Sequence, residues 1–295
     1  MSQLGGETRD IDVEGVTVRC HVDGPEDAPP VVLVHGAGPD AAGVSWKKAF
    51  PALAGSYRTY ALDLPGYGES DPVPQNVAPT TDFYVGVLDV LLDELDLAEV
   101  TLVGISKGGG IVLGYTLDRS DRVERLVLVD SFGLGDRVPG GRKTAVAVKT
   151  PKLLELSWGA MKKSRKVTKA SLGNVVHPEN VHEEFVDDVH REIRRPNSGE
   201  TFFRFAREEM HLSGPRTNYF DRIPDLPVAT LFVHGAEDHL IPLELSERAA
   251  RVAPAADLST IEQCGHWVTR ERPEAFVSRL EEWLEAELTG DARTL

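Results

Sequence analysis

Cysteine is almost absent from this chain of 295 residues, which contains only Cys20 and Cys264. Two cysteines cannot build the disulfide framework of a small secreted domain, so we expect both thiols to be reduced and buried. Long apolar runs are also missing. The first thirty residues hold no stretch suited to a signal peptide, and no later run is long enough to cross a bilayer. These absences predict a cytoplasmic globular protein without a transmembrane segment.

Lysine is scarce as well, with ten residues, and 47 acidic residues outnumber 32 basic ones to give a net charge of −15. An acidic surface of this kind argues against nucleic acid as a partner. It is typical of a protein kept soluble at high salt, and an ordinary acidic cytosolic enzyme accounts for it equally well. Both interpretations stay open.

Ser106 is the first candidate for chemistry, because it stands in the sequence GISKG of residues 104–108, directly after the apolar run of residues 100–103. A strand that turns sharply into a helix holds its central serine in a strained conformation, and glycines two residues to either side avoid collisions there. The pattern predicts a nucleophile elbow. A dinucleotide-binding turn would require glycine where Leu113 stands.

Candidate partners for this serine follow it in chain order. Asp238 comes after the buried-strand pattern of residues 228–233, and His266 precedes an amphipathic helix expected near residues 273–288. A serine hydroxyl is a poor nucleophile until a base takes its proton, and the imidazole needs a carboxylate that fixes its tautomer. The sequence therefore predicts a serine hydrolase.

A second carboxylate competes for the role of the acid. Asp130 ends the sixth expected strand, which makes its carboxylate a candidate for the same role. Asp238 is preferred because Pro242, a residue that suits the first turn of a helix, follows it closely.

Five segments together resemble the α/β-hydrolase family over nearly the whole chain. They are HGAGP at 35–39, DLPGYGES at 63–70, GISKGG at 104–109, HGAEDHLIP at 234–242 and CGHW at 264–267. The resemblance implies a catalytic triad of Ser106, Asp238 and His266, with no cofactor. It also implies an oxyanion hole made by the backbone amides of Ala37 and Lys107. The substrate contacts that we expect beside these groups are Gly36, Gly38 and Trp267.

The order of apolar runs and helical spacing predicts an α/β fold, with eight strands in a mostly parallel sheet covered by helices on both faces. A hairpin opens the chain around Glu14-Gly15, and helices are expected over residues 44–54, 80–95 and 108–118. Asp63, Gly66 and Gly68 are expected to shape the loop after the fourth strand.

No buried-strand pattern occurs between about residues 133 and 224, and the resemblance implies a helical lid inserted after strand 6. We assign residues 135–218 to the lid, and residues 1–134 and 219–295 to the hydrolase core.

The expected lid carries an unusual charge, because residues 137–170 contain ten basic residues against one acid, Glu155. The ten are Arg137, Arg142, Lys143, Lys149, Lys152, Lys162, Lys163, Arg165, Lys166 and Lys169. One interpretation is a solvated face that pairs with the acidic body. The others are a positive rim that attracts an anionic substrate, or a surface that touches acidic lipid.

Three histidines near candidate residues raise the question of a metal. His35, His234 and His239, together with Asp238, include the usual ligand types, but no ligand pair stands at helical spacing on a helix. In the family that the chain resembles, His35 and His234 correspond to scaffold histidines. We therefore expect no metal.

A carboxylic ester hydrolase acting on a small-molecule substrate, as a monomer or homodimer, is the leading interpretation of function. HGAGPD, Trp267 and the lid arginines 191, 194 and 195 also resemble carbon–carbon hydrolases of meta-ring-fission products, whose substrates are anionic dienoates. That group carries asparagine where Ile105 stands here.

Two further alternatives stay open: a cofactor-free perhydrolase or haloperoxidase, and a ligand receptor or scaffold that retains the fold. Haloalkane dehalogenases and epoxide hydrolases are disfavoured, because their nucleophile is aspartate and the elbow here holds serine.

Overall fold

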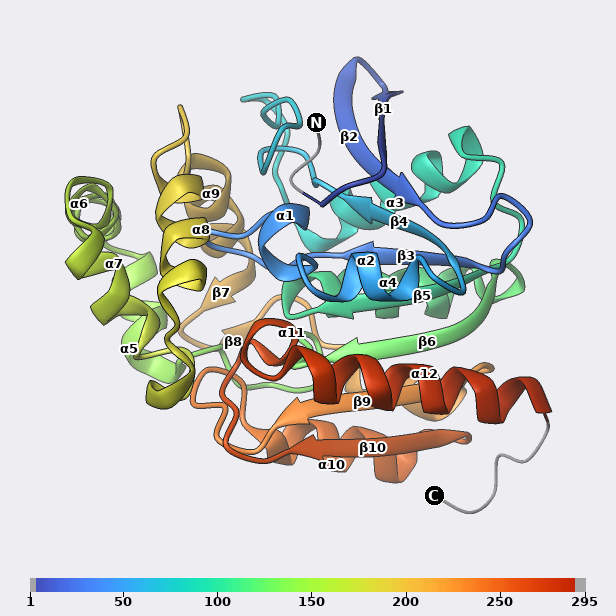
Figure 1. The fold of residues 1–295 in the computed structure, drawn as a ribbon. Helices are drawn as coiled ribbons and strands as arrows, with labels where there is room; N and C mark the ends of the chain where they lie inside the picture. Colours follow the sequence, from blue (N-terminus) through green and yellow to red (C-terminus); the bar gives the residue numbers. More distant parts are fainter. Residues whose placement is uncertain (1–3, 290–295) are drawn as a thin grey trace.

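The computed structural model describes residues 4–289, whose centre is an eight-stranded sheet (Figure 1). The strands, in sheet order, are β1 (Glu7–Val13), β2 (Val16–Asp23), β4 (Arg58–Leu62), β3 (Pro30–Val34), β5 (Val100–Ile105), β6 (Val123–Val129), β9 (Ala229–Gly235) and β10 (Ala256–Ile261). Strand β2 pairs antiparallel with β1 and β4, and all other neighbours are parallel. The predicted α/β class and the mostly parallel eight-stranded sheet are confirmed.

Apolar side chains of the inner strands enter cores on both faces of the sheet. In β3, Val32 and Val34 belong to one core, and Val31 and Leu33 belong to the other. Because successive side chains of a strand alternate between faces, a continuous apolar run suits a strand that is buried on both sides.

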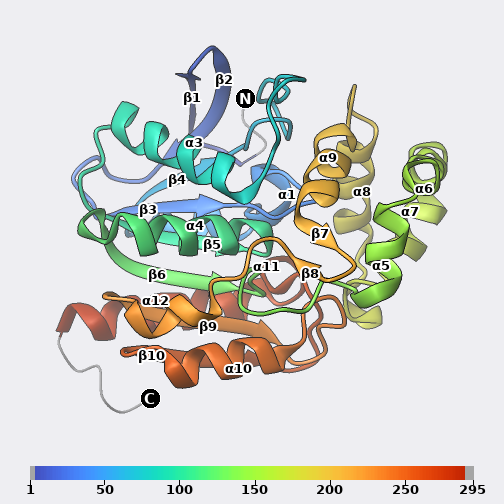
Figure 2. The same ribbon diagram turned by 180° about the vertical axis from the view of Figure 1, so that it is seen from behind.

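Helices cover the two faces, as Figures 1 and 2 show from opposite sides. One face carries α3 (Thr81–Glu94), α4 (Lys107–Asp118) and α10 (Leu243–Val252). The other carries α2 (Ala49–Leu53) and α12 (Pro273–Thr289). The short helix α11 (Val268–Glu271) leads into α12, and 3₁₀ turns lie at Ser120–Arg122, Pro178–Asn180 and Phe220–Asp225.

The single helix expected over residues 44–54 is wrong, because the chain forms two short helices there, α1 (Ala42–Ser45) and α2. Trp46 leaves the helical conformation between them, with φ −102° and ψ 6°. Its fully buried ring packs 6.3 Å from that of Phe276 in α12. Apolar spacing reports which side chains face the core, and two short turns preserve that spacing without a continuous helix.

Five helices occupy the segment between β6 and β9, beyond the carboxyl ends of the parallel strands (Figures 1 and 2). They are α5 (Gly141–Val148), α6 (Pro151–Lys163), α7 (Arg165–Leu172), α8 (Glu183–Ile193) and α9 (Glu200–Glu209). A small hairpin of β7 (Met210–His211) and β8 (Gly214–Pro215) follows them, which the sequence did not predict. The assignment of residues 135–218 as a lid stays a prediction.

Both cysteines are buried and free of a disulfide. None of the helices within residues 4–289 is long and apolar enough to cross a membrane.

Candidate active site

The turn from β5 into α4 holds Ser106 in a conformation that non-glycine residues rarely adopt, with φ 53° and ψ −119°. The amide of Ser106 donates to the carbonyl oxygen of Val129 at 2.9 Å, and its own carbonyl accepts from the amide of Phe132 at 3.0 Å. The end of β6 and the residues after it therefore fix the turn.

Neither flanking glycine leaves room for a side chain. A Cβ atom on Gly104 would lie 2.4 Å from the carbonyl oxygen of Gly108, and one on Gly108 would lie 2.1 Å from the carbonyl oxygen of Val34. The strand and helix thus approach each other as closely as a nucleophile elbow requires.

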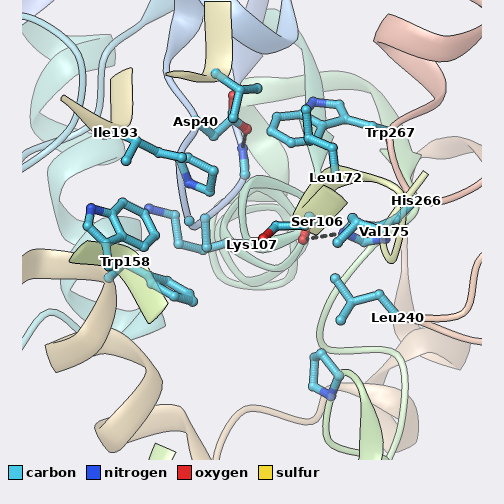
Figure 3. Close-up of a pocket in the computed structure, with 18 of the residues that line it drawn as sticks. Asp40, Ser106, Lys107, Trp158, Leu172, Val175, Ile193, Leu240, His266 and Trp267 are labelled. Atoms are coloured by element: carbon cyan, nitrogen blue, oxygen red, sulfur yellow. Dashed lines mark hydrogen bonds between the residues drawn. The ribbon is translucent and has the colours of Figure 1, made fainter. Parts of the chain in front are cut away.

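Ser106, His266 and Asp238 lie in one hydrogen-bonded chain, although they come from three distant parts of the sequence. The Nε2 atom of His266 is 2.9 Å from the Ser106 hydroxyl (Figure 3), and its Nδ1 atom is 2.7 Å from Oδ2 of Asp238. A carboxylate can only accept, so Nδ1 carries the proton and Nε2 accepts from the serine hydroxyl. This tautomer is the one that a general base needs.

Backbone donors and histidines hold Asp238 in its charged form. Its Oδ1 atom accepts from the amides of Leu240 at 2.7 Å and Ile241 at 2.9 Å. Burial opposes ionisation, but the neighbouring His266 and the side chain of His234 outweigh it and hold the pKa of Asp238 well below its usual range. The carboxylate is therefore charged over the ordinary pH range.

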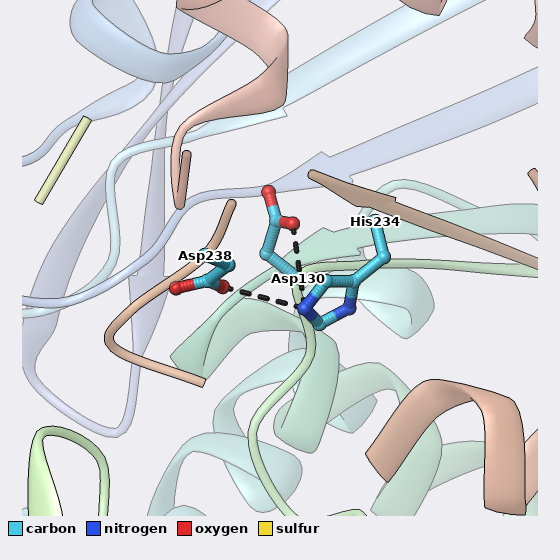
Figure 4. Close-up of side chains that lie close together, drawn as sticks. All are labelled: Asp130, His234 and Asp238. Carbon is cyan, nitrogen blue, oxygen red and sulfur yellow. Dashed lines mark ion pairs between the residues drawn. The ribbon is translucent and has the colours of Figure 1, made fainter. Parts of the chain in front are cut away.

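Asp130, the second candidate acid, contacts other groups (Figure 4). Its carboxylate accepts from the amides of Gly235 at 2.9 Å and Val268 at 3.3 Å, which ties β6 to β9 and to the loop around His266. Burial raises the pKa of Asp130 well above its usual range, and the nearby His234 opposes the shift. The hydrogen bonds of Asp130 thus serve the scaffold, whereas those of Asp238 reach the imidazole of His266.

Asp130, His234 and Asp238 bring three possible metal ligands within 4.8 Å of one another. The imidazole of His234 already has partners, because its Nε2 atom is 2.9 Å from the carbonyl oxygen of Ile241 and its Nδ1 atom is 2.8 Å from the Ser246 hydroxyl. The geometry therefore suits a hydrogen-bonded support for the β9 loop. His239 does not belong to this cluster.

The loop after β3 packs directly against the serine. A Cβ atom on Gly36 would lie 3.3 Å from Cβ of Ser106. Asp40 holds the loop, since its carboxylate accepts from the amides of Gly36 at 2.7 Å and Ala41 at 2.8 Å and from the Ser45 hydroxyl. Burial raises the pKa of Asp40 to about 6 despite these bonds. Sequence analysis did not single out this residue.

Three other loop residues named from the sequence have structural contacts. Nε2 of His35 accepts from the amide of Leu64 at 3.1 Å, and burial lowers the pKa of His35 to about 3. Asp63 accepts from the amide of Ala42 at 2.8 Å, and Gly66 has a positive φ of 84°. These residues shape the loops at the carboxyl edge of the sheet.

A cavity of about 300 Å³ opens above Ser106. All the residues predicted from the sequence to form the oxyanion hole or contact substrate line it: Gly36, Ala37, Gly38, Lys107 and Trp267. Helices α5 to α9 supply most of the remaining wall, including Trp158, Met161, Leu172, Val189, Ile193 and Phe203. Lys107 is the first residue of α4, and the first amides of a helix have no intrahelical partner and carry its positive end.

Among the residues that line this cavity, Asp40 and Lys107 are the only charged types apart from the histidine. The Lys107 side chain is 1% exposed, and its Nζ atom has no hydrogen-bond partner. The sequence predicted a role for the backbone amide of Lys107 and none for its side chain.

The arginines 191, 194 and 195 of α8 and the loop after it line an outer surface pocket together with Asp187 and His190. They are not among the residues around the main cavity.

Part of the basic segment, residues 137–170, pairs with nearby acids. Arg165 forms ion pairs with Glu183 and Asp187, Lys169 pairs with Glu183, and Arg137 pairs with Glu244. The side chains of Arg142 and Lys143 lie outside the described residues.

Comparison with known proteins places these features in a family. The model of the alpha/beta hydrolase family matches residues 31–279. A 2-hydroxy-6-oxo-2,4-heptadienoate hydrolase from Pseudomonas putida is 30% identical over 266 residues, which cover 88% of this chain and 90% of the relative. A 2-hydroxymuconate semialdehyde hydrolase from Pseudomonas sp. strain CF600 is 29% identical, over 94% of this chain and 93% of the relative. Among solved structures, a meta-cleavage product hydrolase from Pseudomonas fluorescens IP01 is 27% identical with a TM-score of 0.79, over 97% of this chain and 99% of that one.

Proposed function

Since the chain belongs to the alpha/beta hydrolase family, we propose that it is a serine-nucleophile hydrolase that cleaves the carbon–carbon bond beside a ketone in an anionic 2-hydroxy-6-oxo-dienoate. The hydrogen-bonded chain from Ser106 through His266 to Asp238, at the floor of an apolar cavity, carries the proposal. The choice of bond rests on the relatives, which match over nearly their full length and are named for such substrates.

In the proposed mechanism, His266 takes the proton of Ser106 as the serine oxygen attacks the ketone carbon. The carbonyl oxygen becomes an oxyanion that the amides of Ala37 and Lys107 stabilise, each contributing on the order of a hundredfold in rate. Before cleavage, the proton of the 2-hydroxyl group must move to C5 of the dienoate, so that the substrate reacts as its 2,6-dioxo tautomer. The bond between C5 and the former ketone carbon then breaks, and its electron pair passes through the conjugated double bond to the 2-oxo group as a dienolate.

The protonated His266 gives its proton to this dienolate and frees the first product. Water, activated by the same imidazole, then hydrolyses the acyl-enzyme on Ser106. Helices α5 to α9 would act as the lid, because a roof of apolar side chains keeps water away until the enolate is protonated.

The test compares two substrates with the same protein. We expect purified enzyme to consume 2-hydroxy-6-oxohepta-2,4-dienoate, followed by loss of its visible absorbance, with a kcat/KM at least tenfold above that for a phenyl ester. Ser106→Ala should abolish this turnover and labelling by a fluorophosphonate. A dienoate that is not consumed by the native enzyme would contradict carbon–carbon hydrolysis.

Carboxylic ester hydrolysis is the second candidate, and the apolar cavity wall favours it. Apart from the triad and the loop after β3, few polar groups line the space, and Ile105 rather than an amide side chain precedes Ser106. Efficient turnover of neutral esters together with an inert dienoate would support this function. If Ser106→Ala keeps both activities, Ser106 is not the nucleophile, and the result would point to a ligand-binding scaffold.

A further inference from the structure

Lys107 is among the residues that line the active-site cavity, and its ammonium is buried with no hydrogen-bond partner among residues 4–289. Its Nζ atom lies over two aromatic rings, 3.7 Å from the ring centroid of Tyr67 and 4.3 Å from that of Tyr84. Figure 3 shows its side chain running from Ser106 toward Trp158, on the side of the serine away from His266.

The surroundings do not satisfy this ammonium. Aromatic faces attract a cation but replace none of its three hydrogen bonds to water. Burial lowers the pKa of Lys107 well below its usual range, which Asp40 opposes. The Asp40 carboxylate, however, is committed to the amides of Gly36 and Ala41 and to the Ser45 hydroxyl. Its negative charge therefore acts on Lys107 at a distance, and the ammonium keeps its hydrogen-bonding capacity.

Among the side chains that the structure describes, no other lysine or arginine lines the cavity. The arginines 191, 194 and 195 are not among these lining residues. Arg195 lines a smaller pocket that shares Asp40 and Trp158 with the cavity, and its guanidinium pairs with Glu192. A carboxylate that enters this apolar space loses its water and requires a charged donor in return.

We propose that the Lys107 ammonium binds the carboxylate of an anionic substrate while the reacting carbonyl lies at Ser106. This inference rests on the proposed function for the identity of the carbonyl compound. Two groups of one residue would then set the substrate's position. The backbone amide of Lys107 would face the oxyanion, and its side chain would hold the far end of the molecule at a fixed distance.

The test uses matched esters, so that it does not depend on carbon–carbon cleavage. The anionic substrate is 4-acetoxybenzoate and the neutral one is its methyl ester, and the measured quantity is the ratio of their kcat/KM values. We expect Lys107→Met to lower this ratio at least tenfold, mainly through a higher KM for the anionic ester. The matched control is Lys163→Met, which removes the same charge from an exposed position of the basic segment and should leave the ratio within twofold.

Variation of pH supplies a readout that a structural role would not give. The ratio should fall as pH rises and Lys107 loses its proton, and in Lys107→Met only the fall caused by Asp40 should remain. Asp40 also faces this region, and its ionisation near pH 6 would lower the ratio too. Asp40→Asn removes the contribution of Asp40 to the pH dependence of the ratio and leaves that of Lys107. His35 stays neutral because its pKa is lowered to about 3, and Tyr67 and Tyr84 stay neutral because burial raises their pKa values.

Inhibition of the native enzyme gives an answer that needs no variant. Benzoate should inhibit hydrolysis of the neutral ester more strongly than benzamide does, and its advantage should shrink as pH rises. A ratio unchanged in Lys107→Met, an equal loss in Lys163→Met, or equal inhibition by the two compounds would overturn the inference. If Lys107 controls the preference and the dienoate is inert, carbon–carbon hydrolysis fails and the anion site stands. If the dienoate is consumed and Lys107→Met leaves the ratio unchanged, carbon–carbon hydrolysis stands and the anion site fails.

Discussion

Asp238→Asn is the substitution that best separates the two candidate acids. Oδ1 of Asp238 accepts from the amides of Leu240 and Ile241, so the asparagine oxygen must take that place and its NH₂ group must face Nδ1 of His266. Nδ1 then has to accept, and the imidazole proton moves to Nε2. In that tautomer Nε2 no longer accepts from the Ser106 hydroxyl.

Loss of the correct tautomer in this way lowers kcat by about ten-thousandfold in serine proteases, and we expect a similar loss here. Asp130→Asn has a different consequence. The NH₂ group of the new side chain would face the amide of Gly235 or Val268, both of which are donors to Asp130 in the native protein. An unpaired buried donor costs about 1–3 kcal/mol of stability, and the His266 tautomer does not change.

The assay is steady-state hydrolysis of a neutral aryl ester, with thermal melting to compare the folded fractions of both variants. The expected result is a large fall in kcat with a small change in Tm for Asp238→Asn, and the opposite for Asp130→Asn. A folded Asp130→Asn protein that loses more turnover than folded Asp238→Asn would move the acid to the end of β6 and refute the assignment.

Three further predictions concern stability and charge. Gly108→Ala should unfold or displace the elbow, because the Cβ atom of the alanine would lie 2.1 Å from the carbonyl oxygen of Val34. The expected readout is loss of fluorophosphonate labelling together with a lower Tm. A variant that is labelled normally would contradict this prediction. Lys107→Met should stabilise the protein by roughly 1–4 kcal/mol near neutral pH, as replacement of buried charges by apolar groups often does. The pKa of Lys107 is lowered in the folded protein, so the unfolded state binds more protons and the stability of the native protein rises with pH. The difference in Tm between Lys107→Met and the native protein should therefore narrow as pH rises. A constant difference would argue against a buried charge. With a net charge of −15, Tm should climb between 0.1 M and 2 M salt if surface carboxylates repel one another, and a flat curve would indicate an ordinary acidic enzyme.

Local rules were sufficient to predict the strands and the elbow from the sequence. Residues 31–34 are apolar at every position, and the structure buries alternate side chains in two separate cores. Gly104 and Gly108 stand at the spacing that the turn requires, and each would collide with backbone atoms if it carried a Cβ atom. Both patterns depend on neighbours in the chain or in the adjacent strand, which a sequence displays directly.

Features that depend on distant contacts could not be read in the same way. Trp46, at the break between α1 and α2, packs against Phe276 in the last helix, more than two hundred residues later. Asp40 holds the loop after β3 because its carboxylate points toward the Gly36 amide and the Ser45 hydroxyl. A sequence gives the type of each side chain, and these roles depend on its direction in the folded molecule.

The sequence left three interpretations of the basic residues in segment 137–170 open, since counting charges along a chain gives each the same weight. Exposed cations such as Arg165 and Lys169 are screened by water and ions and pair with acids of α8, so their field at Ser106 is weak. One ammonium inside an apolar cavity acts through a much lower effective dielectric constant. In the proposed binding mode, Lys107 therefore influences the choice between an anionic and a neutral substrate more than the exposed basic residues of segment 137–170 do. The pair Lys107→Met and Lys163→Met distinguishes selectivity that comes from the cavity from selectivity that comes from the exposed basic segment. Both variants remove one positive charge, and only Lys107→Met removes it at the cavity.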